Sequence, residues 1–317
     1  MRDQFPATDH YANGRFFNPG VKEHGPGDLL RWVTNRERGA WRKGIPSVPG
    51  PKPVERVEGP ELRVTFVGHA TVLLQSEGLN LLTDPVWSQR VSPMSWAGPK
   101  RHRQPGLRFS DLPPIDALLL SHSHYDHFDI ATLKQIRKRH NPAVFCPLGM
   151  RKMVQRLGFR DVHELDWGQA KKWKHMTMHC TRAQHFSART PFDRNRTLWC
   201  GWVAGFAGGD VYFAGDTGYG EWFRELAAAF PALRLALLPI GAYRPEWFMG
   251  PIHMTPWEAL RVHGILQPQA SVGIHYGSFS LADDGETEPV EGLRRAMEEA
   301  PPATPFVLLP EGEARRF

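Results

Sequence analysis

The sequence predicts an α/β fold built as one large domain. Short apolar runs with strand character alternate with helical patterns along most of the chain, which excludes an all-β or an all-α class. The 317 residues exceed a typical domain length, but no Ser/Gly-rich linker divides them. Prolines crowd residues 45–53, so we expect an N-terminal arm over residues 1–53 and a main domain over residues 54–317.

The first strands of the main domain are predicted from alternation and a turn signal. Residues 62–67 alternate between apolar and polar side chains, and shorter strands follow at residues 71–74 and 79–82. The last two are separated by Glu77 and Gly78, which is typical of a hairpin.

Three helices are predicted farther along the chain. The third has the clearest start, because Thr255 supplies an N-cap, Pro256 the first helical position and Glu258 the acidic third residue. The predicted helices span residues 130–138, 221–229 and 256–266.

The most informative motif follows the apolar run at residues 116–120. It supplies His122, His124, Asp126 and His127 within one turn. A short apolar run bounded by prolines and polar residues indicates a buried strand, so these side chains would emerge at its C-terminal end, where open α/β sheets place their sites. Four donors this close cannot all reach one tetrahedral ion without strain. We therefore expect two metal ions, with His122 and His124 on the first and Asp126 and His127 on the second.

Three further donors stand where other predicted strands end. These are His185, Asp216 and His275, and Asp216 lies between glycines that would let its carboxylate approach both ions as a bridge. Imidazole mixed with carboxylate favours a zinc-class ion. Adventitious metal binding by surface histidines is the alternative, and the strand-end position of each donor disfavours it. The expected ligands are His122, His124, His185 and Asp216 for one ion, and Asp126, His127, Asp216 and His275 for the other.

These motifs resemble those of a known family, the metallo-β-lactamase superfamily. The similarity is to its N-acyl-phosphatidylethanolamine-hydrolysing phospholipase D branch, and it includes Gly-Arg-Phe-Phe-Asn-Pro at residues 14–19, Gly-His-Ala-Thr at 68–71, Leu-Thr-Asp-Pro at 82–85 and Phe-Ala-Gly-Asp-Thr-Gly-Tyr at 213–219. The resemblance implies an αββα sandwich of two mixed β-sheets flanked by helices. It also implies a zinc-dependent hydrolase that holds two Zn²⁺ ions, or other divalent transition metals, and cleaves phosphodiester bonds. Residues 54–317 would then be the catalytic domain.

The expected mechanism assigns roles to individual side chains. Two divalent ions lower the pKa of a bridging water toward ~7, and Asp126 and Asp216 would orient the resulting hydroxide. His253 matches a family position near the metals and is the candidate proton donor to the leaving group, with a metal-bound water as its competitor. Arg189 would clamp a phosphate oxygen, unless it is an ordinary loop arginine. Asp84 would orient a ligating imidazole through its second nitrogen.

Three functions compete at this stage. The first is phospholipase D-like hydrolysis of N-acyl-phosphatidylethanolamine or a related phospholipid or small phosphodiester. The second is hydrolysis of a lactone or another carbonyl substrate at the same metals. The third is a non-catalytic metal-binding or membrane-surface module, which two complete ligand sets disfavour.

The arm carries an unusual mixture of cations and apolar side chains. The net charge is +6, and five cations of the arm stand beside leucines and tryptophans. Such a segment would make peripheral contact with an anionic membrane surface, or it would form a helix that packs on the domain with its charges solvated. No nucleic-acid-binding module is visible, and a homodimer stays open. The five cations are Arg31, Arg36, Arg38, Arg42 and Lys43.

Cysteine usage and the N-terminus favour a cytoplasmic location. Cys146, Cys180 and Cys200 are scattered and odd in number, so they predict neither a disulfide framework nor a cysteine zinc site. The N-terminus lacks an apolar signal region, and no apolar run is long enough to span a bilayer. We expect a soluble protein in the cytoplasm, with peripheral contact at the inner membrane face as an option.

Overall fold

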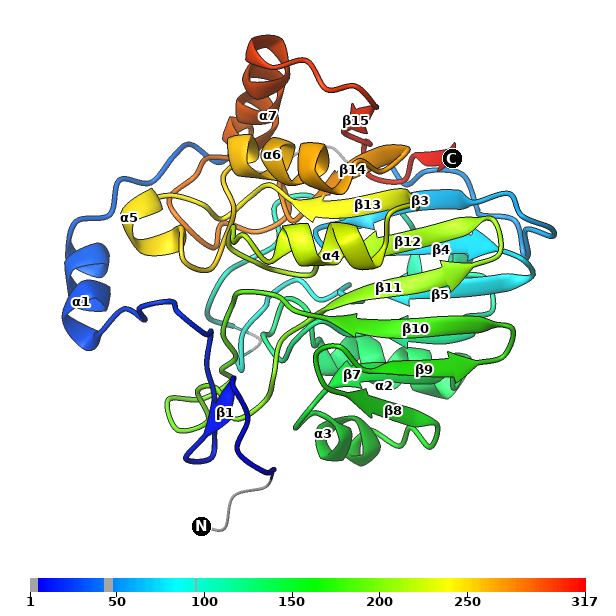
Figure 1. The fold of residues 1–317 in the computed structure, drawn as a ribbon, viewed down its shortest axis with the longest axis horizontal. Helices are drawn as coiled ribbons and strands as arrows, with labels where there is room; N and C mark the ends of the chain where they lie inside the picture. The colour runs from blue at the N-terminus through cyan, green and yellow to red at the C-terminus, as the bar shows by residue number, and fades with distance from the viewer. Residues whose placement is uncertain (1–4, 43–47, 95) are drawn as a thin grey trace.

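The structure is a computed structural model that describes residues 5–42, 48–94 and 96–317. Within these residues two seven-stranded sheets pack face to face, and helices cover their outer faces (Figure 1). The predicted αββα sandwich of two mixed sheets is confirmed.

The first sheet begins with antiparallel hairpins and continues with parallel strands. The strand order is β16-β3-β4-β5-β6-β7-β8, and the pairs from β5 to β8 are parallel. The predicted hairpin joins β4 to β5, with Glu77 at φ 52° and Gly78 at φ 72°, the left-handed values of a tight hairpin turn. Its strands are β3 (Arg63–Gly68), β4 (Thr71–Ser76), β5 (Leu79–Thr83), β6 (Ala117–Leu119), β7 (Ala143–Pro147), β8 (Val162–Leu165) and β16 (Ala314–Arg316).

The second sheet has the same division into an antiparallel and a parallel part. Its order is β15-β14-β13-β12-β11-β10-β9, and the pairs from β12 to β15 are parallel. Large side chains from both sheets, such as Phe66, Trp202 and Tyr212, fill the space between them. Its strands are β9 (Ala170–Trp173), β10 (Met176–Thr181), β11 (Gly201–Phe206), β12 (Gly209–Phe213), β13 (Leu233–Pro239), β14 (Ala270–Ile274) and β15 (Phe306–Val307).

The helices bury their apolar faces on the two sheets. Leu133 and Ile136 of α2 pack with residues of the first sheet, and α6 contacts β13 of the second. The predicted helices at 130–138 and 256–266 are confirmed, while the one expected from residue 221 begins at Phe223 because its first turn uses tighter i→i−3 hydrogen bonds. The helices of the main domain are α2 (Ile130–Arg139), α3 (Arg151–Arg156), α4 (Phe223–Ala229), α5 (Glu246–Met249), α6 (Pro256–Leu266), α7 (Glu288–Glu299) and the short 3₁₀ turn η1 (Phe109–Asp111).

The N-terminal arm folds onto the main domain. It contains a small hairpin, β1 (Tyr11–Ala12) and β2 (Arg15–Phe16), followed by α1 (Pro26–Thr34), which lies beside α5 at the edge of the sandwich (Figure 1). Trp32 of α1 stacks on Phe248 of α5 with ring centres 4.9 Å apart. Lys43 and part of the proline-rich boundary lie outside the described residues, so the division at residue 53 stays a prediction.

Two of the arm's cations are paired with carboxylates of the main domain. Arg36 pairs with Asp283, and Arg42 pairs with Glu286 at 2.7 Å. The Arg36 side chain is 19% exposed, so it is not one of the solvated charges expected of a packed arm, whereas the Arg42 side chain stays 68% exposed. Within the described ranges, none of the helices has the length and apolar character needed to cross a bilayer.

Candidate metal centre

The predicted metal ligands meet at one edge of the sandwich because their strands end there. β10, β12 and β14 run in the same direction, so the segments carrying His185, Asp216 and His275 leave the second sheet at the same edge. From the first sheet, β6 leads into the motif at residues 121–127. The two sheets are joined at this point by a hydrogen bond from the Cys200 amide to the Ser121 carbonyl, 2.9 Å long.

The first predicted ligand set forms a compact group of imidazoles. His124 Nδ1 lies 2.8 Å from His122 Nε2 and 3.2 Å from His185 Nε2. Asp216 Oδ2 lies 3.9 Å from His122 Nε2 and 3.8 Å from His185 Nε2. These ligand atoms are close enough to converge on one ion.

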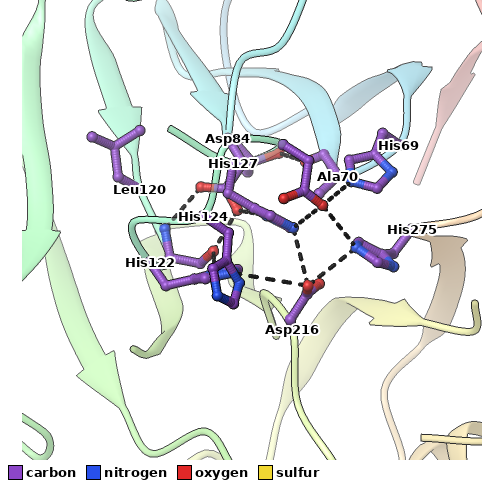
Figure 2. A network of polar contacts seen from close by, with 12 residues as sticks. His69, Ala70, Asp84, Leu120, His122, His124, His127, Asp216 and His275 are labelled. Atoms are coloured by element: carbon purple, nitrogen blue, oxygen red, sulfur yellow. Dashed lines mark hydrogen bonds and ion pairs between the residues drawn. The ribbon is translucent and has the colours of Figure 1, made fainter. Parts of the chain in front are cut away.

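The second set shares the same aspartate. Asp216 Oδ2 lies 3.0 Å from His127 Nε2 and 3.1 Å from His275 Nε2. Asp126 Oδ2 lies 3.3 Å from His127 Nε2 and 3.5 Å from His275 Nε2. Figure 2 shows the Asp216 carboxylate joined by dashed lines to His122, His127 and His275. One carboxylate oxygen thus faces imidazoles of both sets, which is the arrangement expected of a bridging ligand.

The donor set fits two transition-metal ions. Asp216 Oδ1 is buried without a hydrogen-bond partner among the described residues, and the buried His127 Nε2 and His275 Nε2 make no well-aligned hydrogen bond there, although they lie 3.0 Å and 3.1 Å from Asp216 Oδ2. Buried polar atoms are normally satisfied, and a metal ion would satisfy these. His185 Nδ1 donates to the Ile252 carbonyl at 2.9 Å, which leaves its Nε2 lone pair facing the site. Imidazole and carboxylate together suit a zinc-class ion.

The imidazoles of the two ligand sets differ in charge when no metal is bound. Burial lowers the pKa of His124 to about 4 and holds those of His122 and His185 well below the usual range, so these rings are neutral ligands at pH 7. Burial also disfavours charge on His275, but the carboxylates of Asp216 and Asp126 outweigh it and raise its pKa to about 9. A divalent cation would take the place of such protons, so binding would release them.

Asp84 occupies the supporting position predicted for it. Its Oδ2 accepts a hydrogen bond from His127 Nδ1 at 2.6 Å, and its Oδ1 accepts one from the Ser121 amide at 2.8 Å. Because a carboxylate only accepts, His127 carries its proton on Nδ1 and turns the Nε2 lone pair toward the site. Asp84 is fully buried, as this role requires.

His253 lies beside both ligand sets, whereas Arg189 does not face the site. The His253 ring centre is 5.0 Å from that of His185 and 5.3 Å from that of His275, and burial lowers its pKa to about 3. Arg189 Nη1 donates to the carbonyls of Ser123 and Phe128, at 2.8 Å and 3.0 Å. Its Nη1 therefore braces the turn at residues 123–128. Arg189 does not line the pocket above the predicted ligands, so this geometry gives the predicted phosphate clamp no support.

A pocket of about 680 Å³ opens above the predicted ligands. Its floor includes His124, Asp216 and His275, and its walls come from α1, α5 and the segments around residues 21 and 194. Sequence reasoning missed these wall residues because they come from separate segments that carry no motif. They include Val21, Lys22, Trp32, Arg194, Phe248 and Ile252.

Comparison with known proteins agrees with this geometry. The family described as the beta-lactamase superfamily domain matches residues 79–276. N-acyl-phosphatidylethanolamine-hydrolyzing phospholipase D 1 of Caenorhabditis elegans is 39% identical over 267 residues, covering 80% of this chain and 75% of that protein. The mitochondrial N-acyl-phosphatidylethanolamine-hydrolyzing phospholipase D of Saccharomyces cerevisiae is 34% identical, covering 78% of this chain and 55% of its own length.

A solved structure shares the fold at low sequence identity. Igni18, a metallo hydrolase from the archaeon Ignicoccus hospitalis, superposes with a TM-score of 0.61 at 22% identity, covering 81% of this chain and 98% of that one. The αββα sandwich, the clustered candidate ligands and these relatives all indicate the same family. The chain belongs to the metallo-β-lactamase superfamily of metal-dependent hydrolases, in the branch that includes the phospholipase D proteins of worm and yeast.

Proposed function

We propose that the protein is a binuclear zinc phosphodiesterase with phospholipase D-like action on N-acyl-phosphatidylethanolamine or a related phospholipid. The observation that carries the proposal is the pair of ligand sets sharing Asp216 at the floor of a pocket with apolar walls. The names of the worm and yeast relatives support the same substrate class.

The side chains around the site have distinct tasks in this reaction. Two divalent ions held by the ligand sets would supply hydroxide at neutral pH and neutralise charge developing on phosphorus. Asp126 and Asp216 accept hydrogen bonds and orient the nucleophile for attack. A new bond forms from the nucleophile oxygen to phosphorus, and the bond from phosphorus to the head-group oxygen breaks. Burial keeps the His253 ring neutral. The neutral ring donates a hydrogen bond from its N–H to the leaving oxygen, and water supplies the proton that this oxygen takes up.

The pocket walls suit a lipid diester. Trp32, Phe248 and Ile252 offer apolar surface to an acyl chain, while Lys22 and Arg194 add positive charge on the same walls. A volume of about 680 Å³ lies within the usual range for sites that enclose one drug-sized ligand. The remaining chains of a phospholipid would stay outside, in a lipid layer.

The exposed edge of α1 would hold the pocket mouth against that layer. Leu29, Leu30 and Val33 are 49%, 64% and 56% exposed, and Leu29 also lines the pocket. Phe192, beside the pocket residue Pro191, is 81% exposed. Because Arg36 and Arg42 are paired within the chain, we assign this contact to the insertion of these apolar side chains.

A substrate comparison tests the reaction class. The zinc-loaded protein is assayed on vesicles containing N-acyl-phosphatidylethanolamine, on a small soluble phosphodiester and on a lactone, each with and without a chelator. We expect chelator-sensitive release of an N-acylethanolamine from the vesicles. Lactone turnover without phosphodiester turnover would favour the carbonyl hydrolase instead.

A surface variant tests the lipid contact separately. Leu30→Ser removes an exposed leucine whose burial is worth about 1.5–3 kcal/mol, or roughly ten- to hundredfold in affinity. Vesicle binding and vesicle turnover should fall by that factor, and turnover of the soluble diester should not change. Val54→Ser alters an apolar side chain that is 42% exposed and outside the described pocket lining, and it serves as the control. Equal effects of both variants on vesicles would overturn the contact.

A further inference from the structure

His69 contacts the second ligand set in two ways from the turn between β3 and β4. Its side chain is 1% exposed, and its Nε2 lies 2.9 Å from Asp126 Oδ2. Its backbone carbonyl accepts a 2.8 Å hydrogen bond from the His275 amide. The ring centres of His69 and His275 are 4.2 Å apart, and the two rings lie side by side in Figure 2.

The turn holds His69 in a backbone conformation that few side chains adopt. His69 has φ 58° and follows Gly68 at φ 130°, where the pairing of β3 with β4 shifts register. Left-handed φ at a non-glycine residue carries strain and is retained where the surrounding structure over-determines it. Here the strained residue places its carbonyl against one predicted ligand and its ring against another.

Proximity alone would also allow His69 to be a metal ligand. Its Nε2 belongs to a group with ligand atoms of Asp126, His127 and His275 that all lie within 4.8 Å of one another. However, a carboxylate can only accept, so the 2.9 Å contact with Asp126 needs a proton on His69 Nε2. A protonated ring nitrogen has no lone pair for a metal. By contrast, His127 Nε2 and His275 Nε2 lie 3.0 Å and 3.1 Å from Asp216 Oδ2, the oxygen shared by both ligand sets. Within the described residues, the ion pair of His69 is with Asp126 and not with Asp216.

We propose that His69 is a positioning residue that fixes Asp126 through its Nε2–H and His275 through its backbone carbonyl. The inference rests on the metal centre of the proposed function but does not depend on the substrate. It assigns His69 the support of the second ion, as Asp84 supports His127 from the opposite side of the same set.

Metal affinity is the direct test, with chelator competition used to measure the two zinc dissociation constants. His69→Ala should raise one of the two zinc dissociation constants by ten- to hundredfold, the usual cost of losing an outer partner of a ligand. His69→Gln, which can place an amide N–H near the position of Nε2, should recover most of this loss. The melting temperature of the metal-free variants shows whether each one folds.

A double-mutant cycle separates positioning from direct ligation. If His69 acts through Asp126, His69→Ala should add little to Asp126→Asn. Full affinity in His69→Ala, or equal loss of zinc in folded His69→Gln and His69→Ala, would overturn the proposal. So would additive losses in the cycle, because they would show that His69 does not act through Asp126. All these measurements are made without substrate, so a failed phosphodiesterase assay leaves their outcome intact.

Discussion

Asp84→Asn should weaken the metal site while leaving the fold largely intact. The two oxygens of Asp84 accept hydrogen bonds from His127 Nδ1, from the Ser121 amide and from the Ser121 hydroxyl. An asparagine has one oxygen in place of the two carboxylate oxygens of Asp84. In either orientation of the side chain, its NH2 group therefore faces a hydrogen-bond donor. One buried donor then lacks a partner, which costs about 1–3 kcal/mol of stability. If that donor is His127 Nδ1–H, the ring can turn, and metal affinity or activity should fall about 10–100-fold.

The assay pairs zinc affinity with thermal unfolding of the metal-free protein, and Asp129→Asn is the matched control. Asp129 is also a buried carboxylate with several donors, since it accepts from Ala131 at the start of α2 and from Ser88 and Thr132. The control should lose similar stability while keeping zinc affinity. Equal affinity losses in the two variants would refute the reasoning, because they would show that the effect comes from general destabilisation.

Two further predictions concern the bridge and the arm. Asp216→Asn should lower turnover by several orders of magnitude in a folded protein, because an amide bridges two cations poorly; near-normal kcat with both ions bound would exclude a bridging role. Burial tends to raise the pKa of Glu286, but hydrogen bonds from Arg42 and Arg103 lower it from 4.5 to about 2. The ionised carboxylate therefore stabilises the fold fully above pH ~4.5 and loses this contribution as the pH falls toward 2. Glu286→Gln should flatten the decline of unfolding free energy over that interval, and an unchanged decline would contradict the assignment.

The clustering of the candidate ligands was predictable because these residues carry local signals. The histidines at 122, 124 and 127 follow an apolar strand, and His185, Asp216 and His275 each follow another. Strand ends of an α/β sandwich collect at shared edges, so a sequence pattern was enough to bring these donors together. The hairpin at Glu77 and Gly78 was predictable for a similar reason, since a glycine-containing pair between two short apolar runs is a local turn signal.

The surroundings of the centre could not be predicted in the same way. The pocket walls combine Trp32 with Phe248, more than two hundred positions apart, and such a contact leaves no periodicity in the sequence. The pairing of Arg36 with Asp283 likewise depends on how the arm returns to the domain. The phosphate clamp predicted for Arg189 rested on its spacing from His185, which is visible in the sequence. The backbone carbonyls that bind its Nη1 are visible only in the structure.

Metal content measured together with activity tests the central claim most directly. The purified protein is titrated with zinc after chelation, and bound zinc and phosphodiester turnover are followed in the same samples. The shared position of Asp216 predicts that turnover reaches its maximum only as the second zinc ion binds, at close to two ions per chain. Full activity with a single bound ion would contradict the binuclear centre.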